Sequence, residues 1–363
     1  MKMRIIWGLL IAAMLLGLFA CGDQPEIEDE TTTESTTTTA ETTEDEPPEI
    51  IDPPEPVGDY INPLTGLPSW EDYSGVRPVA FMFNNIRVAL PQSGISMADV
   101  VYEAEAEGGI TRIVGIFCDI GGVEKIGTIR STRPVFINIA QTYDAVLIFC
   151  GYSPAAGTML KTYRDHIDGL TDGFDTFWRD AERRKTAGYE HSLYTNDERI
   201  LKEINRQKMR MTVDTARQSA YSFTDEGFIP ENAGAANRVT LTYWSAYKPY
   251  FEYDAEQGEY LRFSYNAPHI DEANDNIQLA FKNVIVLNVT SRAIDSEGRR
   301  RFDDIGSGAG IYVTNGGWIP IRWSKAGMTA PLMLTAEDGQ QLKINPGRVF
   351  IGFVNGMGNW AVE

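Results

Sequence analysis

The segment from Gly22 to Tyr60 decides how much of this chain can form a folded core. It holds fourteen acidic residues and no Lys or Arg, and Thr, Ser and Pro make up most of the remainder. Such a segment cannot bury enough apolar surface to offset its conformational entropy, and its like charges repel one another. We predict that residues 21–59 form a disordered tether, which leaves about 300 residues for folded structure.

The amino terminus has the order of a bacterial signal peptide. Lys2 and Arg4 precede an apolar run, and Ala20 stands immediately before Cys21. The apolar run is too short to cross a bilayer comfortably. We predict that residues 1–20 are removed and that Cys21 carries fatty acyl chains such as palmitate, which anchor the protein to the outer, extracytoplasmic face of the cell membrane. The alternative is an ordinary secretory signal in which Cys21 is incidental.

The formal net charge of −19 is dominated by the tether. Without the tether acids and the two cations of the signal peptide, 37 acidic and 30 basic residues remain, a net charge of −7. The folded part therefore lacks the excess of basic residues that is typical of nucleic-acid-binding proteins. The remaining length exceeds what one compact core usually holds, so we predict two domains.

Two further cysteines, Cys118 and Cys150, each end an apolar, strand-like run. Outside the cell they could form a disulfide. Two free thiols buried on sheet strands are the alternative that the apolar runs favour.

Residues 60–212 alternate strand-like and helical stretches, which is typical of an α/β domain. Arg77–Phe83 is predicted to be a buried strand that leads into Asn84 and Asn85. A strand that ends in polar residues places them at the edge of a sheet, where α/β proteins bind ligands.

A hairpin is predicted next along the chain. Val100–Glu107 alternates apolar and acidic residues, so a regular strand would present three glutamates on one face: Glu103, Glu105 and Glu107. A Gly-Gly turn then leads into the return strand Ile110–Cys118. In that register Glu105 lies opposite Arg112.

Helix starts follow the hairpin. Pro134–Thr142 is predicted to be a helix with proline at its first position, and Ala145–Cys150 a buried strand. Ser153 precedes Pro154 as an N-cap. A capping box at Thr195–Glu198 opens a helix that is expected to extend to about Met211.

The helical pattern disappears after a linker at residues 213–237. From residue 238 to 363 the sequence consists of short strand-like runs separated by Gly, Asp and Asn turns. Gly306–Gly310 lacks the Lys of a phosphate-binding loop and is predicted to be a turn. The fold class is therefore α+β overall, with an amino-terminal α/β domain built on a mixed sheet with flanking helices, and a carboxy-terminal mostly-β domain.

Short motifs connect the sequence to a known family. They include Asn62-Pro63-Leu64-Thr65-Gly66, Pro91-Gln92-Ser93-Gly94, Glu107-Gly108-Gly109-Ile110-Thr111-Arg112 and Trp323-Ser324-Lys325. On these motifs the chain resembles the YerB-like bacterial lipoproteins, a family of unknown function with separable amino- and carboxy-terminal parts. The resemblance implies the two-part architecture and no established activity.

Two arginines mark a candidate anion site. Arg130 and Arg133 precede the helix start at Pro134, where free backbone N–H groups and the helix dipole favour an anion. Two guanidinium groups there would hold a carboxylate or phosphate. The alternative is that both arginines pair with the strand glutamates in a structural ion-pair network.

Glu103 and His191 are the candidates for catalysis. A pair of carboxylates can hydrolyse a glycosidic bond when burial raises the pKa of one of them. His191 lies in a loop just before the predicted capping box and is one of three histidines. The sequence contains neither HExxH nor GxSxG and no closely spaced Cys/His set, so we expect no metal ion and no cofactor.

These features predict a membrane-tethered binding or scaffold module of the cell envelope. Its ligand would be an anionic wall glycan, a peptide or an envelope protein, and its alternative function is a hydrolase that uses Glu103 or His191 with Arg130 and Arg133. The candidate ligand-binding residues are Asn84, Asn85, Glu103, Arg112, Arg130, Arg133, Ser153 and His191.

Overall fold

The computed structural model describes residues 58–363 with gaps at 173–174, 215–220 and 226. The described residues belong to one compact unit. The predicted signal peptide, the lipidation site Cys21 and the tether up to residue 57 lie outside them. Within the described part, no helix is both long and apolar enough to cross a membrane.

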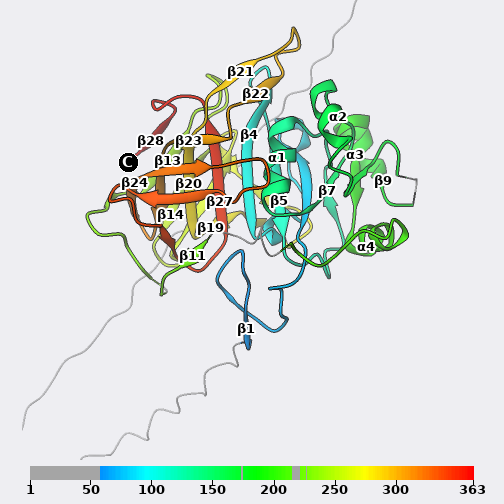
Figure 1. Cartoon of the computed structure of the whole chain (residues 1–363). Helices are drawn as coiled ribbons and strands as arrows, with labels where there is room; N and C mark the ends of the chain where they lie inside the picture. The colour runs from blue at the N-terminus through cyan, green and yellow to red at the C-terminus, as the bar shows by residue number, and fades with distance from the viewer. Residues whose placement is uncertain (1–57, 173–174, 215–220, 226) are drawn as a thin grey trace, which may run out of the picture. The chain divides into compact units, whose positions relative to one another are not determined.

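An eleven-stranded sheet runs through the molecule (Figure 1). Its strands follow the order β12-β24-β23-β20-β27-β4-β5-β3-β7-β8, and β25 pairs with β24. Their bounds are β12 Gly234–Ala235, β24 Gly317–Lys325, β23 Gly306–Thr314, β20 Asn283–Asn288, β27 Val349–Val354, β4 Val100–Glu107, β5 Ile110–Phe117, β3 Val79–Asn84, β7 Val146–Phe149, β8 His166–Asp168 and β25 Met333–Ala336.

Residues 60–212 and residues 238–363 share this sheet. The junction is the parallel pairing of β27 with β4, in which Gly352 lies opposite Glu103. β20, β27, β4, β3, β7 and β8 all run in the same direction. Their carboxyl ends therefore lie along one edge of the sheet, which we call the carboxyl edge.

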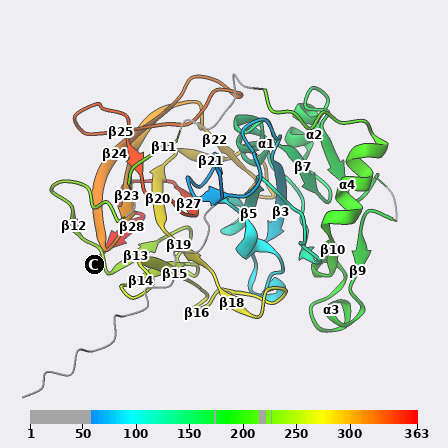
Figure 2. The ribbon, with the colours of Figure 1, turned by 90° about the horizontal axis from the view of Figure 1, so that it is seen from below.

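Helices cover one face of the sheet. α1 (Pro134–Thr142) and α2 (Pro154–Leu160) pack their apolar side chains against it, together with the hairpin of β21 (Ser291–Ala293) and β22 (Arg300–Phe302). Figure 2 shows these elements on one side of the sheet. The helix predicted at Pro134–Thr142 has these bounds in the structure.

A second layer covers the opposite face. It contains α4 (Asp197–Arg206) and a six-stranded sheet, and their buried side chains share one core with the central sheet. The strands of this second sheet are β13 Arg238–Leu241, β14 Tyr250–Asp254, β15 Glu259–Ser264, β16 Ala267–Pro268, β19 Ala280–Phe281 and β28 Trp360–Val362. The carboxy-terminal region is thus mostly β, as predicted.

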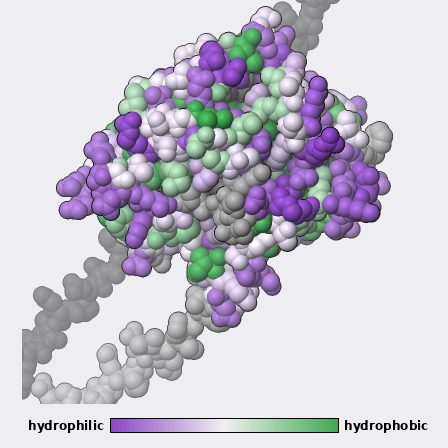
Figure 3. All heavy atoms as spheres, in the orientation of Figure 1, coloured by the Kyte–Doolittle hydropathy of each residue, from purple (hydrophilic) through white to green (hydrophobic). Residues whose placement is uncertain are grey.

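Smaller elements complete the fold. β6 (Ile126–Gly127), β9 (Trp178–Arg179) and β10 (Leu193–Thr195) form a three-stranded sheet beside α3 (Ala181–Thr186). Hydrophilic side chains cover the side of the molecule that carries α3, β9 and α4 (Figure 3). The remaining short elements are β1 Tyr60–Ile61, β2 Pro68–Ser69, β11 Ser222–Phe223, β17 Ile270–Asp271, β18 Ile277–Gln278, β26 Lys343–Ile344, and the 3₁₀ turns Arg87–Ala89, Ile95–Met97 and Tyr189–His191.

The hairpin of β4 and β5 differs from its predicted register. Glu105 lies opposite Thr111 rather than Arg112, because a β-bulge between Glu105 and Glu107 inserts an extra residue into β4. Arg112 lies opposite Ala104 instead. A bulge turns the following residue to the other face, so Glu103 and Glu107 do not share a face and the prediction of one acidic face is wrong.

Two other local predictions are corrected. The helix that begins at the predicted capping box has Asn196 as its N-cap. It ends at Arg206 rather than near Met211, and Lys208, two residues after its end, adopts a left-handed conformation. Gly306–Gly310 is not a turn but the first half of β23. A Cβ at Gly308 would lie 2.5 Å from the Trp323 ring, so glycine here permits the close pairing of β23 with β24.

Cys118 and Cys150 are free thiols. Cys118 is buried in the core beneath α1, and burial raises the pKa of its thiol above the usual range. The favoured prediction of two free cysteines is confirmed, although Cys150 is only half-buried.

Gly352, at the junction of β27 with β4, offers a test of how the second sheet packs on β27. An added Cβ would lie 2.3 Å from Leu241 Cδ2 in the second sheet. We expect Gly352→Val to lower the free energy of unfolding by about 1–3 kcal/mol through overpacking, measured by chemical denaturation. The matched control is Gly327→Val, because a Cβ at Gly327 meets nothing within 4 Å among the described residues. Equal stability of the two variants would contradict the packing at the junction.

Candidate functional site

The carboxyl edge gathers most of the polar residues that the sequence singles out. Asn84 ends β3, Glu107 ends β4, and Arg112 lies opposite Asn84 near the start of β5. Arg133 and Ser153 are the N-caps of α1 and α2, which begin just beyond the same edge. The strand directions and the two helix starts therefore bring these residues into one region.

Glu107 is shared by two arginines. Its carboxylate accepts hydrogen bonds from Arg133 Nε at 2.7 Å and Nη2 at 3.0 Å, and from Arg112 Nη2 at 2.5 Å. Both arginines are buried. Arg112 Nη1 is buried as well and has no hydrogen-bond partner among the described residues. Burial, and after it the charge of Arg133, lowers the pKa of Arg112 to about 9, so the group still carries its charge at neutral pH.

Arg130 and His191 form a second group beside this pair. Arg130 Nη2 donates to Glu190 Oε2 at 2.6 Å, so Arg130 pairs with a loop carboxylate and not with a strand glutamate. His191 Nδ1 and Asn84 Nδ2 are 2.7 Å apart. Burial, followed by the charge of Arg130, lowers the pKa of His191 below its usual value. The surroundings of His191 therefore resist a further positive charge.

Glu103 lies inside the molecule, away from the arginines proposed as its partners. It is completely buried, and its Oε1 accepts hydrogen bonds from Asn85 Nδ2 at 2.8 Å and Thr111 Oγ1 at 2.6 Å. Its Oε2 accepts a hydrogen bond at 2.7 Å from Nη2 of Arg262, which lies on β15 in the second layer. The ion pair thus joins the central sheet to the layer that covers it.

Sequence reasoning missed the partners of Glu103. Arg262 Nε donates to His269 Nδ1 at 2.9 Å, and His269 Nε2 lies 2.9 Å from Gln92 Oε1. One signal was available: Arg262 alternates with Tyr260 and Ser264, and all three side chains are buried. A charged residue on the inward face of a strand requires a buried partner.

The eight candidate residues thus divide into separate groups. Asn85 and Glu103 belong to the interior network, Arg112 and Arg133 share Glu107, and Asn84 and His191 contact each other near Arg130. Ser153 accepts a hydrogen bond from Ala156 N and caps α2. Within the described part of the chain, no three His, Cys, Asp or Glu side chains are placed to hold a metal ion.

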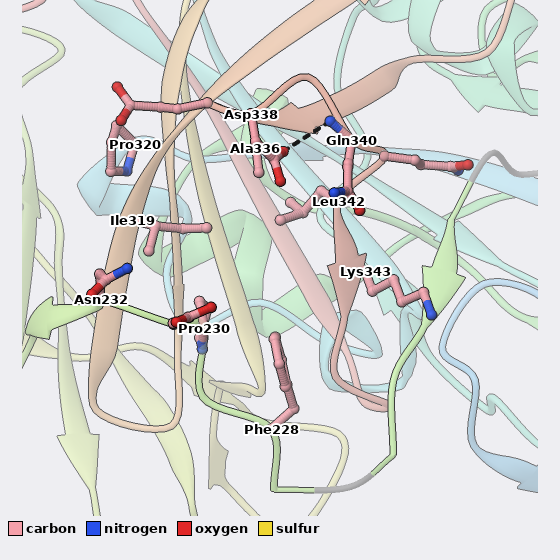
Figure 4. A pocket seen from close by; sticks show the side chains of 13 residues that line it. Phe228, Pro230, Asn232, Ile319, Pro320, Ala336, Asp338, Gln340, Leu342 and Lys343 are labelled. Carbon is pink, nitrogen blue, oxygen red and sulfur yellow. Dashed lines mark hydrogen bonds between the residues drawn. The ribbon is translucent and has the colours of Figure 1, made fainter.

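A pocket of about 540 Å³ lies elsewhere, at the outer edge of β24 (Figure 4). β12 pairs with β24 at Gly317 and Trp318, and β25 pairs with it from Ile321 onward, so the pocket opens at Ile319 and Pro320 between them. Pro320 has no N–H to donate to an added strand. The described lining residues include none of the eight candidates. Pro320 also makes this edge unfavourable for pairing with a further strand.

The chain matches two regions of one protein family. Residues 64–210 match the amino-terminal domain, and residues 239–351 the carboxy-terminal domain, of the family described as Protein of unknown function (DUF3048). The curated protein named "Putative lipoprotein YerB" from Bacillus subtilis (strain 168) is 30% identical over 295 residues, which cover 80% of this chain and 85% of that protein. The chain belongs to the DUF3048 family. The predicted resemblance to YerB-like lipoproteins is confirmed.

The fold agrees with a solved structure of this family. The crystal structure of the YerB protein from Bacillus subtilis matches with a TM-score of 0.74 and 27% sequence identity, covering 84% of this chain and 99% of that chain. The two DUF3048 regions meet within the central sheet, because β4 lies in the first region and β27 begins in the second. Glu103 and Arg262 likewise come from different regions.

The interior ion pair can be tested by a double-mutant cycle. We expect Glu103→Leu or Arg262→Met alone to lower the free energy of unfolding by about 3–5 kcal/mol, because each leaves an unpaired buried charge. The double variant should lose less than the sum of the two losses, as measured by chemical denaturation.

The exposed pair of Lys185 and Glu182 provides the control, since its removal should cost about 1 kcal/mol or less. Strict additivity of the Glu103 and Arg262 variants would show that the two groups do not interact.

His191 generates a prediction about pH. An unfolded histidine takes up a proton near pH 6.5, whereas folded His191, with its lowered pKa, resists that proton. The unfolded state therefore binds more protons as the solution is acidified, and the native state loses stability. We expect the free energy of unfolding to fall more for the wild type than for His191→Gln between about pH 7.5 and about pH 5.5. Parallel pH profiles of the two proteins would be inconsistent with this burial of His191.

Proposed function

We propose that this DUF3048 protein is a membrane-tethered, extracytoplasmic binding module that holds an anionic group of an envelope ligand at Arg112 and Arg133. In this proposal Cys21 carries the lipid and the protein stands on the outer face of the cell membrane. The kinship to a protein named as a lipoprotein supports the anchoring.

One observation carries the binding proposal: two buried guanidinium groups share a single carboxylate. Glu107 neutralises one of the two charges, and Arg112 Nη1 has no partner among the described residues. A buried charge without a counter-ion is costly, and an unpaired buried N–H adds to that cost. A bound carboxylate or phosphate would supply both the missing charge and the missing acceptor.

The surroundings favour an anion for a second reason. Arg133 is the N-cap of α1, a nine-residue helix, so the positive end of the helix dipole lies beside the pair. Arg130 is partly exposed at the same edge and pairs only with the exposed Glu190 among the described residues. It would meet further negative charge on a larger ligand such as an anionic wall glycan, a peptide or an envelope protein.

The alternative of an envelope hydrolase gains no comparable support. A general acid or base must reach the substrate. Glu103 is completely buried and is held by Arg262, Asn85 and Thr111. His191 contacts the Asn84 amide rather than a carboxylate that could orient it. We therefore propose binding and not hydrolysis at this edge.

Phosphate provides a direct probe of the charge imbalance. We expect phosphate at constant ionic strength to raise the Tm of the wild type and to have little effect on Arg112→Met, which removes the unpaired group. Glu107→Gln should lower the free energy of unfolding by about 3 kcal/mol, because it leaves two buried cations without a carboxylate. It should also gain more from phosphate than the wild type does.

The control is Arg292→Met, which removes an exposed arginine paired with Asp303. Its Tm should respond to phosphate as the wild type does. The binding proposal fails if Arg112→Met keeps the full phosphate response.

A further inference from the structure

A second cavity lies between α1 and β22, which pack beside each other (Figures 1 and 2). Its volume is about 670 Å³, within the range that holds small ligands. α1 and α2 come from the first DUF3048 region, and β22 and the segments that line the opposite wall come from the second. The lining residues used below are Asn138, Met159, Phe302, Asp304, Ile305 and Met328.

The polar part of this cavity contains hydrogen-bond acceptors from Asn138 and Asp304. Asn138 Nδ2 donates to both oxygens of Asp304, at 3.1 Å and 2.9 Å. One N–H of the amide is shared between the two oxygens, and Asn138 Oδ1 has no partner among the described residues. Asn138 is only 8% exposed and lines the cavity. A buried acceptor without a partner requires an explanation, and a hydrogen-bond donor on a molecule bound in the cavity would supply one.

Lys325 places a buried positive charge near Asp304. Lys325 is buried, and its Nζ donates to the main-chain oxygen of Asn138 at 3.2 Å. The positive charge of Lys325 acts on Asp304, and burial lowers the pKa of Lys325 to about 8. Both charged groups belong to the protein, so the cavity floor favours uncharged donors such as hydroxyl groups over a second ammonium.

The remaining walls are apolar. Met159 and Phe302 line the cavity, and Ile305 and Met328 stand at its rim with 46% and 48% of their surface exposed. A few hydrophobic side chains lie among hydrophilic ones at the top of the space-filling view, where Figure 1 places β21 and β22 (Figure 3). Exposed apolar side chains around a pocket with a few convergent polar groups are typical of a ligand site.

We propose that this cavity binds an uncharged, hydroxyl-bearing ring, namely a sugar residue of a glycan. Ring hydroxyl groups donate to Asn138 Oδ1 and Asp304, and the C–H face of the ring packs on Phe302 and Met328. The site is distinct from the anion site at Arg112, and the two proposals can be tested independently. Because Arg133 directly precedes the first residue that lines the cavity, Pro134, the two sites together fit one glycan that carries both hydroxyl and anionic groups.

The test uses the full chain and the neutral disaccharide N,N′-diacetylchitobiose, with binding followed by calorimetry or ligand-observed NMR. We expect the wild type to bind the disaccharide and Asn138→Leu to bind it at least about tenfold more weakly, the effect of losing one or two good hydrogen bonds. Asn205→Leu on α4 is the matched control, because Asn205 is an exposed helical asparagine and should leave binding unchanged.

Two further variants keep the outcome decisive. Met328→Asp changes an exposed wall residue without disturbing the core, so it should weaken binding of the disaccharide even if Asn138→Leu fails to fold. Arg112→Met should retain disaccharide binding while losing the phosphate response, which separates this site from the anion site. The proposal is overturned if the wild type does not bind the disaccharide, or if Asn138→Leu or Met328→Asp binds it as well as the wild type.

Discussion

The ion pair between Glu103 and Arg262 is the interaction on which the rest of this architecture depends. Both side chains are completely buried, and each comes from a different DUF3048 region. Asn85, Thr111, Tyr247 and His269 provide further polar contacts around the pair. Buried charges are tolerated only with such partners, so the second layer must dock in one orientation for Glu103 to be satisfied. That docking is consistent with a single sheet that continues from β4 into β27.

The continuous sheet in turn creates the functional edge. Parallel strands from both regions end along one line, and α1 and α2 begin beside it. Two groups around α1 have no hydrogen-bond partner among the described residues: Arg112 Nη1, which lacks an acceptor, and Asn138 Oδ1, which lacks a donor. Arg112 Nη1 is a hydrogen-bond donor and Asn138 Oδ1 an acceptor. In our proposal they bind an anionic group and a hydroxyl group of the same envelope ligand.

Much of the local structure was predictable from the sequence. The Val100–Glu107 strand, the Pro134–Thr142 helix and the Ser153 cap have the predicted positions, because each depends on residues that are neighbours along the chain. The register of the hairpin was not predictable, since nothing in the alternating pattern marks the bulge after Glu105. The alternative to the anion site, in which both arginines pair with strand glutamates, holds for Arg133, which pairs with Glu107, and not for Arg130, which pairs with Glu190.

The sequence by itself determined many of the strands, the helix starts and the division into an α/β region and a mostly-β region, because periodicity and capping act over a few residues. Only the tertiary structure decided the partner of Glu103, which lies 159 positions away, and the pairing of β4 with β27. It also decided which groups stay unsatisfied at Arg112 and Asn138. Such groups are identified only when every surrounding donor and acceptor is in place, because hydrogen bonding is a property of the whole environment and not of the local chain.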